Sequence, residues 1–255
     1  MSINFLLTFH LILLILFVHS SLCSANANRL KSKSRIAKRF VLHRHQWDHC
    51  QLTWSFRDPF LLLPSEERFK QAKKVIGEAI SKWEIAGKHL LHLIDVSPKS
   101  RESPLNSHRV ANIDIFFAEF VHGDGESFDG SGGLVAHSAY PPLGIVHFDA
   151  SERWNIGHRK GGNAGGGGHR QPPRRGGPSP LSLDLRYVAL HEIGHALGLR
   201  HSAYRHSVMN TYYRENLKVS EGTNGGPATE GFNLSKDDEA AINELFGDKC
   251  HQRSR

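Results

Sequence analysis

The sequence has little cysteine, with 3 cysteines among 255 residues. Cys23 falls in the apolar N-terminal segment, which leaves Cys50 and Cys250 near the two ends of the remaining chain. An even number of cysteines in an oxidising compartment favours a disulfide between them. At most one disulfide is therefore expected in the mature protein.

Long apolar runs are lacking everywhere except at the N-terminus. Residues 5–18 form a nearly unbroken apolar run followed by small residues, which is the pattern of a secretory signal peptide rather than of a membrane span. No later segment approaches the length of a membrane span, which excludes such a span in the mature chain. We expect residues 1–24 to be a signal peptide, with a signal anchor as the alternative, and the protein to be secreted to the extracellular space or matrix.

Residues 25–39 are basic and polar, and they show no hydrophobic periodicity. The segment is expected to be a short disordered stub or a propeptide. It ends in Lys38-Arg39, a dibasic pair at which a processing protease could cut to leave Phe40 as the new terminus. A solvated run of charge is the alternative interpretation.

Residues 40–250 have the length of one domain. Apolar positions at helical spacing predict a helix over residues 66–86 that ends at Gly87, and alternating apolar residues predict strands over residues 112–120 and 145–149. Ser235 and Asp238 indicate the start of a final helix, which Gly247 is expected to close.

Residues 157–180 interrupt this pattern with many glycines, prolines and arginines. The segment has no hydrophobic periodicity and is expected to be a disordered insertion. Its positive charge and the net charge of +7 could attract an anionic polysaccharide. The alternative is a loop that only increases solubility, and no nucleic-acid partner is expected.

Residues 191–201 read HEIGHALGLRH, and they carry most of the functional interpretation. On a helix, His191 and His195 project from one face. Gly198 can adopt a left-handed conformation that ends the helix and brings His201 round as a third ligand. Three imidazoles that leave a fourth position open are typical of a catalytic zinc site. The alternative is an amphipathic core helix whose histidines are satisfied by hydrogen bonds.

Glu192 lies beside the first of these histidines and is the expected general base. Zinc held by three neutral ligands lowers the pKa of a bound water to about 7. Glu192 can take the proton of that water and later pass it to the leaving amine. The expected activity is the hydrolysis of internal peptide bonds.

The chain resembles the matrixins, the matrix metalloproteinases among the metzincin zinc endopeptidases. Ser202 follows the third histidine, as in the matrixins, and Met209 comes shortly afterwards. The resemblance places Met209 in a tight turn beneath the three imidazoles, whereas an ordinary core methionine is the alternative. It implies an α+β fold with a twisted, mixed, mostly parallel sheet and three helices. A different metzincin protease is the alternative family.

The resemblance also implies a structural zinc site and a calcium site between residues 113 and 154. Three imidazoles and a carboxylate would close the coordination of a structural zinc, and carboxylates with backbone carbonyls suit calcium. Without the resemblance, the Gly/Asp-rich segment would be interpreted as a plain turn. The expected structural zinc ligands are His122, Asp124, His137 and His147. The expected calcium ligands are Asp129, Gly130, Gly132, Leu134, Asp149 and Glu152.

Residues 134–137 resemble the edge strand of the matrixins, in which Leu134, Val135 and Ala136 would pair with an extended substrate peptide. The implied substrates are extracellular proteins or peptides, including matrix proteins, and a monomer is expected. The alternative function is a non-catalytic, metal-stabilised module that binds the extracellular matrix.

The chain departs from the matrixin pattern at several positions. Ile145 stands where the family has an aspartate of a further calcium site, which is therefore expected to be missing or weakened. Thr211 replaces a proline near the specificity pocket. No P-R-C-G motif precedes the zinc motif, so no cysteine-switch propeptide is expected. A free Cys50 that blocks the zinc is the alternative to a disulfide with Cys250.

Overall fold

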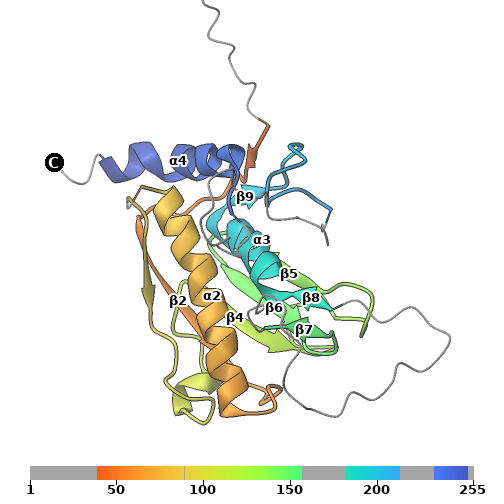
Figure 1. The fold of residues 1–255 in the computed structure, drawn as a ribbon. Coiled ribbons are helices and arrows are strands. Elements are labelled where there is room, and N and C mark those ends of the chain that lie inside the picture. The colour runs from red at the N-terminus through yellow and green to blue at the C-terminus, as the bar shows by residue number, and fades with distance from the viewer. Residues whose placement is uncertain (1–38, 89, 157–181, 213–232, 252–255) are drawn as a thin grey trace, which may run out of the picture. The chain divides into compact units, whose positions relative to one another are not determined.

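A computed structural model of the chain describes residues 39–88, 90–156, 182–212 and 233–251. Three α-helices and a five-stranded mixed sheet organise these residues (Figure 1). The helices are α2 (Glu66–Ala86), α3 (Leu185–Leu197) and α4 (Lys236–His251), with a 3-10 helix η1 (Pro104–Ser107). No helix in these ranges is long and apolar enough to cross a membrane.

The five-stranded sheet is parallel except at one edge. Its order is β3 (His92–Asp95), β2 (Gln51–Arg57), β4 (Ile113–Ala118), β6 (Ile145–Asp149) and β5 (Ala136–Ala139). Only β5 runs antiparallel to its neighbour. Two short ladders pair β1 (Val41–Leu42) with β9 (Leu199–Arg200), and β7 (Trp154–Asn155) with β8 (Leu183–Asp184). The expected α+β fold, with three helices and a mostly parallel mixed sheet, is confirmed.

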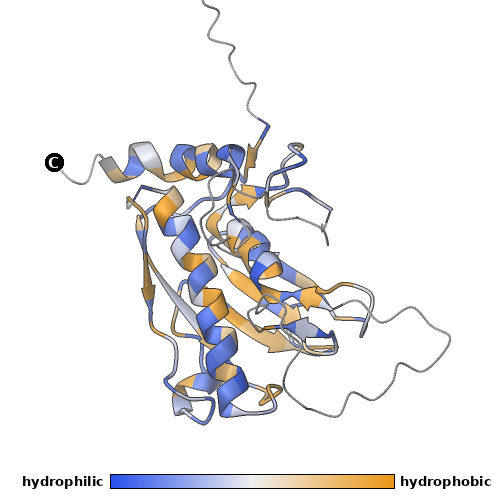
Figure 2. Ribbon diagram, viewed as in Figure 1, coloured by the Kyte–Doolittle hydropathy of each residue, from blue (hydrophilic) through white to orange (hydrophobic). Residues whose placement is uncertain are grey.

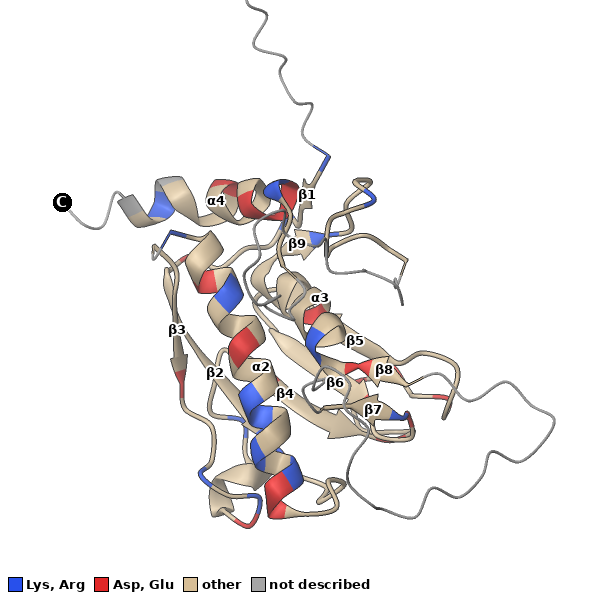
Figure 3. Cartoon of the chain, in the orientation of Figure 1, with Lys and Arg blue, Asp and Glu red and all other residues tan. Residues whose placement is uncertain are grey.

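Helices α2 and α3 lie side by side over one face of this sheet (Figure 1). Apolar and polar residues alternate along α2 (Figure 2), and its apolar residues from Phe69 to Trp83 are buried. Figure 3 shows basic and acidic residues interspersed along this helix. Two indole N–H groups donate to backbone carbonyls of α3. Trp83 donates to Leu190, and Trp47 donates to Ala196, each at a distance of 3.0 Å. The core therefore fixes α3, the helix that carries the histidine motif.

Several elements have the predicted bounds. Helix α2 begins after its cap Ser65 and ends at Gly87. Strand β6 coincides with residues 145–149, and β4 lies inside the predicted range of 112–120. The edge strand β5 begins and ends two residues later in the chain than the predicted range of 134–137. Val135, which precedes it, still pairs with the sheet, because its carbonyl accepts the N–H of Asp149 at 2.9 Å.

The expectation that Gly247 closes the last helix is wrong. Helix α4 begins after Ser235, as predicted, but it continues to His251. A glycine inside a helix costs only about 1 kcal/mol relative to alanine. The next turn carries Cys250, which is 5% exposed and is joined to Cys50 by a disulfide. Burial and this covalent link hold the helix together beyond the glycine.

Other expectations lie outside the described residues. They concern the signal peptide, most of the basic stub, the 157–180 insertion and the polysaccharide interaction proposed for that insertion.

Candidate active site and metal centres

Helix α3 carries the first two histidines of the motif and ends where the chain must turn to deliver the third. Asp184 caps the helix by accepting the N–H of Arg186 at 2.9 Å. Gly198 ends it in a left-handed conformation with φ of 117°, a region that favours glycine. The chain then forms β9 and reaches His201 directly afterwards.

The three histidines of the motif converge. One ring nitrogen of each lies within 4.8 Å of the others, and the Nε2 atoms of His191 and His195 are 3.2 Å apart. The Nδ1 atoms of these two rings lie 2.7 Å from the carbonyls of Val208 and Leu199. A carbonyl oxygen can only accept a hydrogen bond, so each Nδ1 carries the proton. Each Nε2 therefore directs a lone pair toward the common point, as a metal ligand must.

Burial keeps the imidazoles of His195 and His201 in the neutral form that binds metal. It lowers the pKa of His195 to about 3, and the neighbouring His191 and His201 contribute to the shift. Burial, His191 and Arg200 likewise lower the pKa of His201. Because zinc binds neutral imidazole, this cluster fits a divalent metal at neutral pH.

Met209 packs against the histidine-bearing turn of α3. Its side chain is 2% exposed and contacts Gly194, at which a β-carbon would overlap the sulfur. The carbonyl of Met209 accepts the N–H of Ser202, next to His201, at 2.8 Å. The structure thus places an apolar thioether against the turn of α3 that carries His191 and His195.

The start of α4 holds the turn that contains Met209. Asp238 accepts the N–H of Val208 at 3.0 Å and also binds the hydroxyls of Ser207 and Ser235. The carbonyl of Val208 in turn orients His191. Asp238, which is 1% exposed, therefore supports the first histidine through one backbone residue.

Glu192 faces the edge strand of the sheet. Its side chain is largely buried, and its Oε2 accepts a hydrogen bond from the hydroxyl of Ser138 on β5 at 2.5 Å. A carboxylate beside a trio of metal-ligating imidazoles is suited to accept a proton from a metal-activated water.

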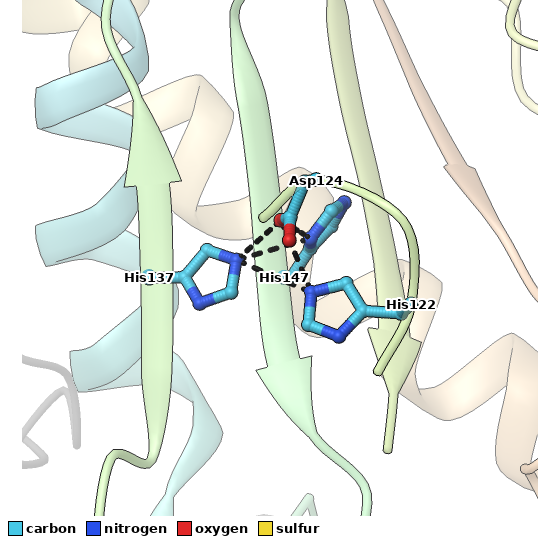
Figure 4. Close-up of side chains that lie close together, drawn as sticks. All are labelled: His122, Asp124, His137 and His147. Atoms are coloured by element: carbon cyan, nitrogen blue, oxygen red, sulfur yellow. Dashed lines mark hydrogen bonds and ion pairs between the residues drawn. The ribbon is translucent and has the colours of Figure 1, made fainter. Parts of the chain in front are cut away.

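A second cluster, which contains His122, Asp124, His137 and His147, lies at the sheet (Figure 4). His122 and Asp124 belong to the loop after β4, whereas His137 and His147 face each other across β5 and β6. The Oδ2 of Asp124 lies 2.7 Å from the Nε2 of His137, 2.9 Å from the Nδ1 of His147 and 3.0 Å from the Nε2 of His122. All four predicted ligands of the structural zinc are therefore brought together.

The pKa values of His147 and Asp124 in this second cluster suit a metal ion. Burial lowers the pKa of His147 to about 3, assisted by His137 and opposed by Asp124. Burial alone would raise the pKa of Asp124, but hydrogen bonds from the Glu126 backbone and from His137, with the other nearby histidines, lower it to about 2. Neutral imidazoles and an ionised carboxylate form a closed donor set for tetrahedral zinc.

The predicted calcium ligands surround one loop but converge less closely. The carboxylate of Glu152 accepts the N–H of Gly132 at 2.5 Å, and that of Asp129 accepts the N–H of Leu134 at 2.9 Å. Asp149 is fully buried, and its Oδ2 has no hydrogen-bond partner within the described ranges. Among the described residues, the ligand atoms of each histidine cluster lie within 4.8 Å of one another. The three carboxylates of the calcium loop do not converge so closely. The unsatisfied oxygen of Asp149 is the feature that a cation would explain.

Ser138 is a residue of this site that the sequence analysis did not identify. A local signal existed, because Ser138 follows His137 and alternate residues of a strand face opposite sides. That signal does not show which helix packs on the second side. The contact with Glu192 spans 54 residues of sequence, so only the folded chain reveals it.

Comparison with known proteins agrees with this geometry. A family model described as matrixin matches residues 46–247. Matrix metalloproteinase-16 of Homo sapiens is 30% identical over 218 residues, which cover 82% of this chain and 29% of that protein. Stromelysin-3 of Mus musculus is 30% identical over 82% of the chain and 33% of its own length. A hatching enzyme of Paracentrotus lividus is 34% identical over 77% of the chain and 27% of its length.

The chain therefore spans about a third or less of these relatives. The family match extends from the segment before β2 to the C-terminal part of α4 and includes both histidine clusters. The chain belongs to the matrixin family.

Proposed function

We propose that this chain is a secreted zinc endopeptidase that hydrolyses internal peptide bonds of extracellular proteins. The observation that carries the proposal is the convergence of His191, His195 and His201 beside the buried carboxylate of Glu192. Three neutral ligands leave a coordination position free, as a catalytic site requires. The matrix metalloproteinases and the hatching enzyme among its relatives support this activity.

In the proposed mechanism, His191, His195 and His201 would hold a zinc ion, which would supply Lewis acidity toward the attacking water and the scissile carbonyl. Glu192 takes the proton of that water and later delivers it to the leaving amine. The carbonyls of Val208 and Leu199 keep the imidazoles of His191 and His195 in the tautomer that binds metal.

The edge of the sheet is the proposed site for the substrate backbone. In the described residues β5 pairs only with β6, so its outer edge can accept an extended peptide. The preceding residues Leu134 and Val135 are at least partly exposed, and with Ala136 they continue this edge. Extracellular matrix proteins are the proposed substrate class, by analogy with the relatives.

Two further metals are proposed as structural. The cluster His122, Asp124, His137 and His147 would hold a second zinc and tie the loop after β4 to β5 and β6. Calcium would be held by the 129–134 loop together with Asp149 and Glu152. The buried, unpartnered Oδ2 of Asp149 supports this assignment.

Processing after Arg39 is a proposal that the position of the segment supports. The carbonyl of Arg39 lies 3.4 Å from the Ser202 hydroxyl, and that hydroxyl donates to Asp237 at 2.6 Å. Cleavage would create an ammonium group at Phe40 close to this carboxylate. Asp238 is already bound to Val208 and two serines, so Asp237 is the proposed partner of the new terminus.

The substitution Glu192→Ala tests the function. The rate of hydrolysis of a quenched peptide is expected to fall at least about 10²-fold, because the proton acceptor is lost. Zinc content should remain at about two ions per chain, because no proposed ligand changes. Removal of zinc by a chelator should abolish wild-type hydrolysis, and added zinc should restore it.

The alternative, a non-catalytic module that binds the matrix, predicts a different result. Purified, zinc-loaded wild type would then cleave no member of a peptide library. Such a result, or near wild-type hydrolysis by Glu192→Ala, would contradict the proposed function.

A further inference from the structure

Ser138 has no role in the mechanism proposed above. Its hydroxyl donates to the Oε2 of Glu192, with 2.5 Å between the two oxygens. Glu192 is 8% exposed, and its Oε1 makes no hydrogen bond within the part of the chain that the structure describes. One carboxylate oxygen is therefore held while the other is left available for a proton.

Strand β5 directs Ser138 toward α3. Successive side chains of a strand point to opposite faces of a sheet. The preceding residue, His137, points into the second cluster, where its Nε2 lies 2.7 Å from Asp124. Ser138 therefore points to the other face, against which α3 packs. Its partner across the ladder is Val146 on β6, which fixes the position of Ser138 along the sheet.

We propose that Ser138 is a positioning residue that holds the carboxylate of Glu192 in the orientation required of the general base. The inference rests on the proposed function, because Glu192 is a general base only if the chain is a peptidase.

Physical considerations favour this role. Helix α3 fixes the backbone of Glu192, but the glutamate side chain retains several rotatable bonds. A hydrogen bond to an ionised acceptor is stronger than one between neutral groups. A base whose rotamer is already fixed needs no rearrangement before proton transfer, which favours the transition state. Because Ser138 contacts the base, its effect should appear in turnover rather than in substrate affinity.

The substitution Ser138→Ala tests the proposal. The value of kcat for a quenched peptide is expected to fall about tenfold, with KM changed by less than about twofold. Zinc content should equal that of the wild type. Ser138→Thr retains the hydroxyl on a side chain that suits a strand, and it is expected to restore most of kcat.

Ser55→Ala is the matched control. Ser55 lies on β2 of the same sheet and is fully buried, and its hydroxyl has no hydrogen-bond partner in the part of the chain that the structure describes. This variant removes a strand hydroxyl that does not contact Glu192, so kcat should stay at the wild-type value. In a Glu192→Gln background, Ser138→Ala should have no further effect on residual hydrolysis, because the two side chains act as one unit.

Crystal structures of zinc-loaded wild type and Ser138→Ala provide a readout that does not depend on activity. The Glu192 carboxylate is expected to bind Ser138 in the wild type and to rotate or become disordered in the variant. The proposal is overturned if Ser138→Ala retains the full wild-type kcat, or if its lower activity comes from a raised KM or from lost zinc. It is also overturned if the Glu192 carboxylate has the same orientation in both crystals. A zinc-loaded wild type that cleaves no peptide would contradict the proposed function instead, and the two crystals would still test the contact.

Discussion

At the scale of single residues, the candidate active site depends on a glycine as well as on histidines. Gly194 lies between His191 and His195 on α3. A β-carbon there would overlap the sulfur of Met209 and come within 3.0 Å of the Trp83 ring. Both neighbours are buried, so a close-packed interior leaves them little room to move. Because Gly194 has no side chain, the turn that contains Met209 can approach α3 closely.

Gly194→Ala is expected to lower the free energy of unfolding by about 1–3 kcal/mol, because overpacking outweighs the better helix propensity of alanine. Gly77→Ala is the matched control on α2, where a β-carbon meets Trp54 at an ordinary 3.7 Å. The control should keep or raise stability, by up to about 1 kcal/mol. Urea unfolding of both variants measures the difference, and equal stabilities would contradict the packing argument.

The convergence of the three histidines of the motif could be predicted from sequence because their placement is local. Helical spacing sets His191 beside His195, and a left-handed glycine turns the chain toward His201. Gly198 indeed has a φ of 117°. The carbonyls of Leu199 and Val208 could not be predicted as the groups that orient the rings. Every residue has a carbonyl, and only tertiary structure selects the one that approaches a given imidazole.

At the scale of elements, strand β5 contacts both candidate metal sites. His137 faces the second cluster, while the next residue, Ser138, contacts Glu192 of the first. The same strand forms the sheet edge proposed to bind substrate. Any change that loosens β5 is therefore expected to affect metal content and turnover together.

Asp124→Ala tests this coupling. Asp124 contacts all three histidines of the second cluster, so its loss should reduce zinc content from about two ions to about one per chain. Turnover should also fall, since β5 then loses an anchor.

Glu126→Ala is the control for that experiment. This carboxylate belongs to the same loop, but its side chain is 70% exposed and lies 4.0 Å from His137. Zinc content and kcat should be retained. Full turnover by an Asp124→Ala chain with one zinc would show that the clusters are independent.

The elements themselves were predictable to different degrees. Helix α2 and strand β6 follow from hydrophobic periodicity and from Gly87, and their observed bounds agree. The end of α4 was mispredicted, because the bond between Cys50 and Cys250 and the burial of Cys250 are tertiary features. The shift of β5 has a similar origin, since its pairing with β6 defines its ends.

At the scale of the whole molecule, one disulfide joins the beginning and end of the described domain. Cys50 precedes β2, and Cys250 lies in the last turn of α4, at a sequence separation of 200. Closing so long a loop restricts the unfolded chain strongly. The sequence favours a disulfide between these two cysteines. This bond anchors α4 to the residue that precedes β2.

Replacing both cysteines with serine is expected to reduce the free energy of unfolding by about 2–5 kcal/mol. Denaturant titration of the zinc-loaded protein, with and without the substitutions, measures this loss. The single variants should behave like the double variant, because each removes the same bond. Identical midpoints for wild type and double variant would show that the bond contributes nothing to stability.

The hydrogen bonds of Asp238 make the support of His191 depend on α4. During synthesis, residues 191–201 leave the ribosome before Asp238 does, and until then Val208 lacks the contact that places its carbonyl against His191. A chain without α4 therefore lacks this support of His191. Under the proposed function, hydrolysis would begin only once the whole domain has folded.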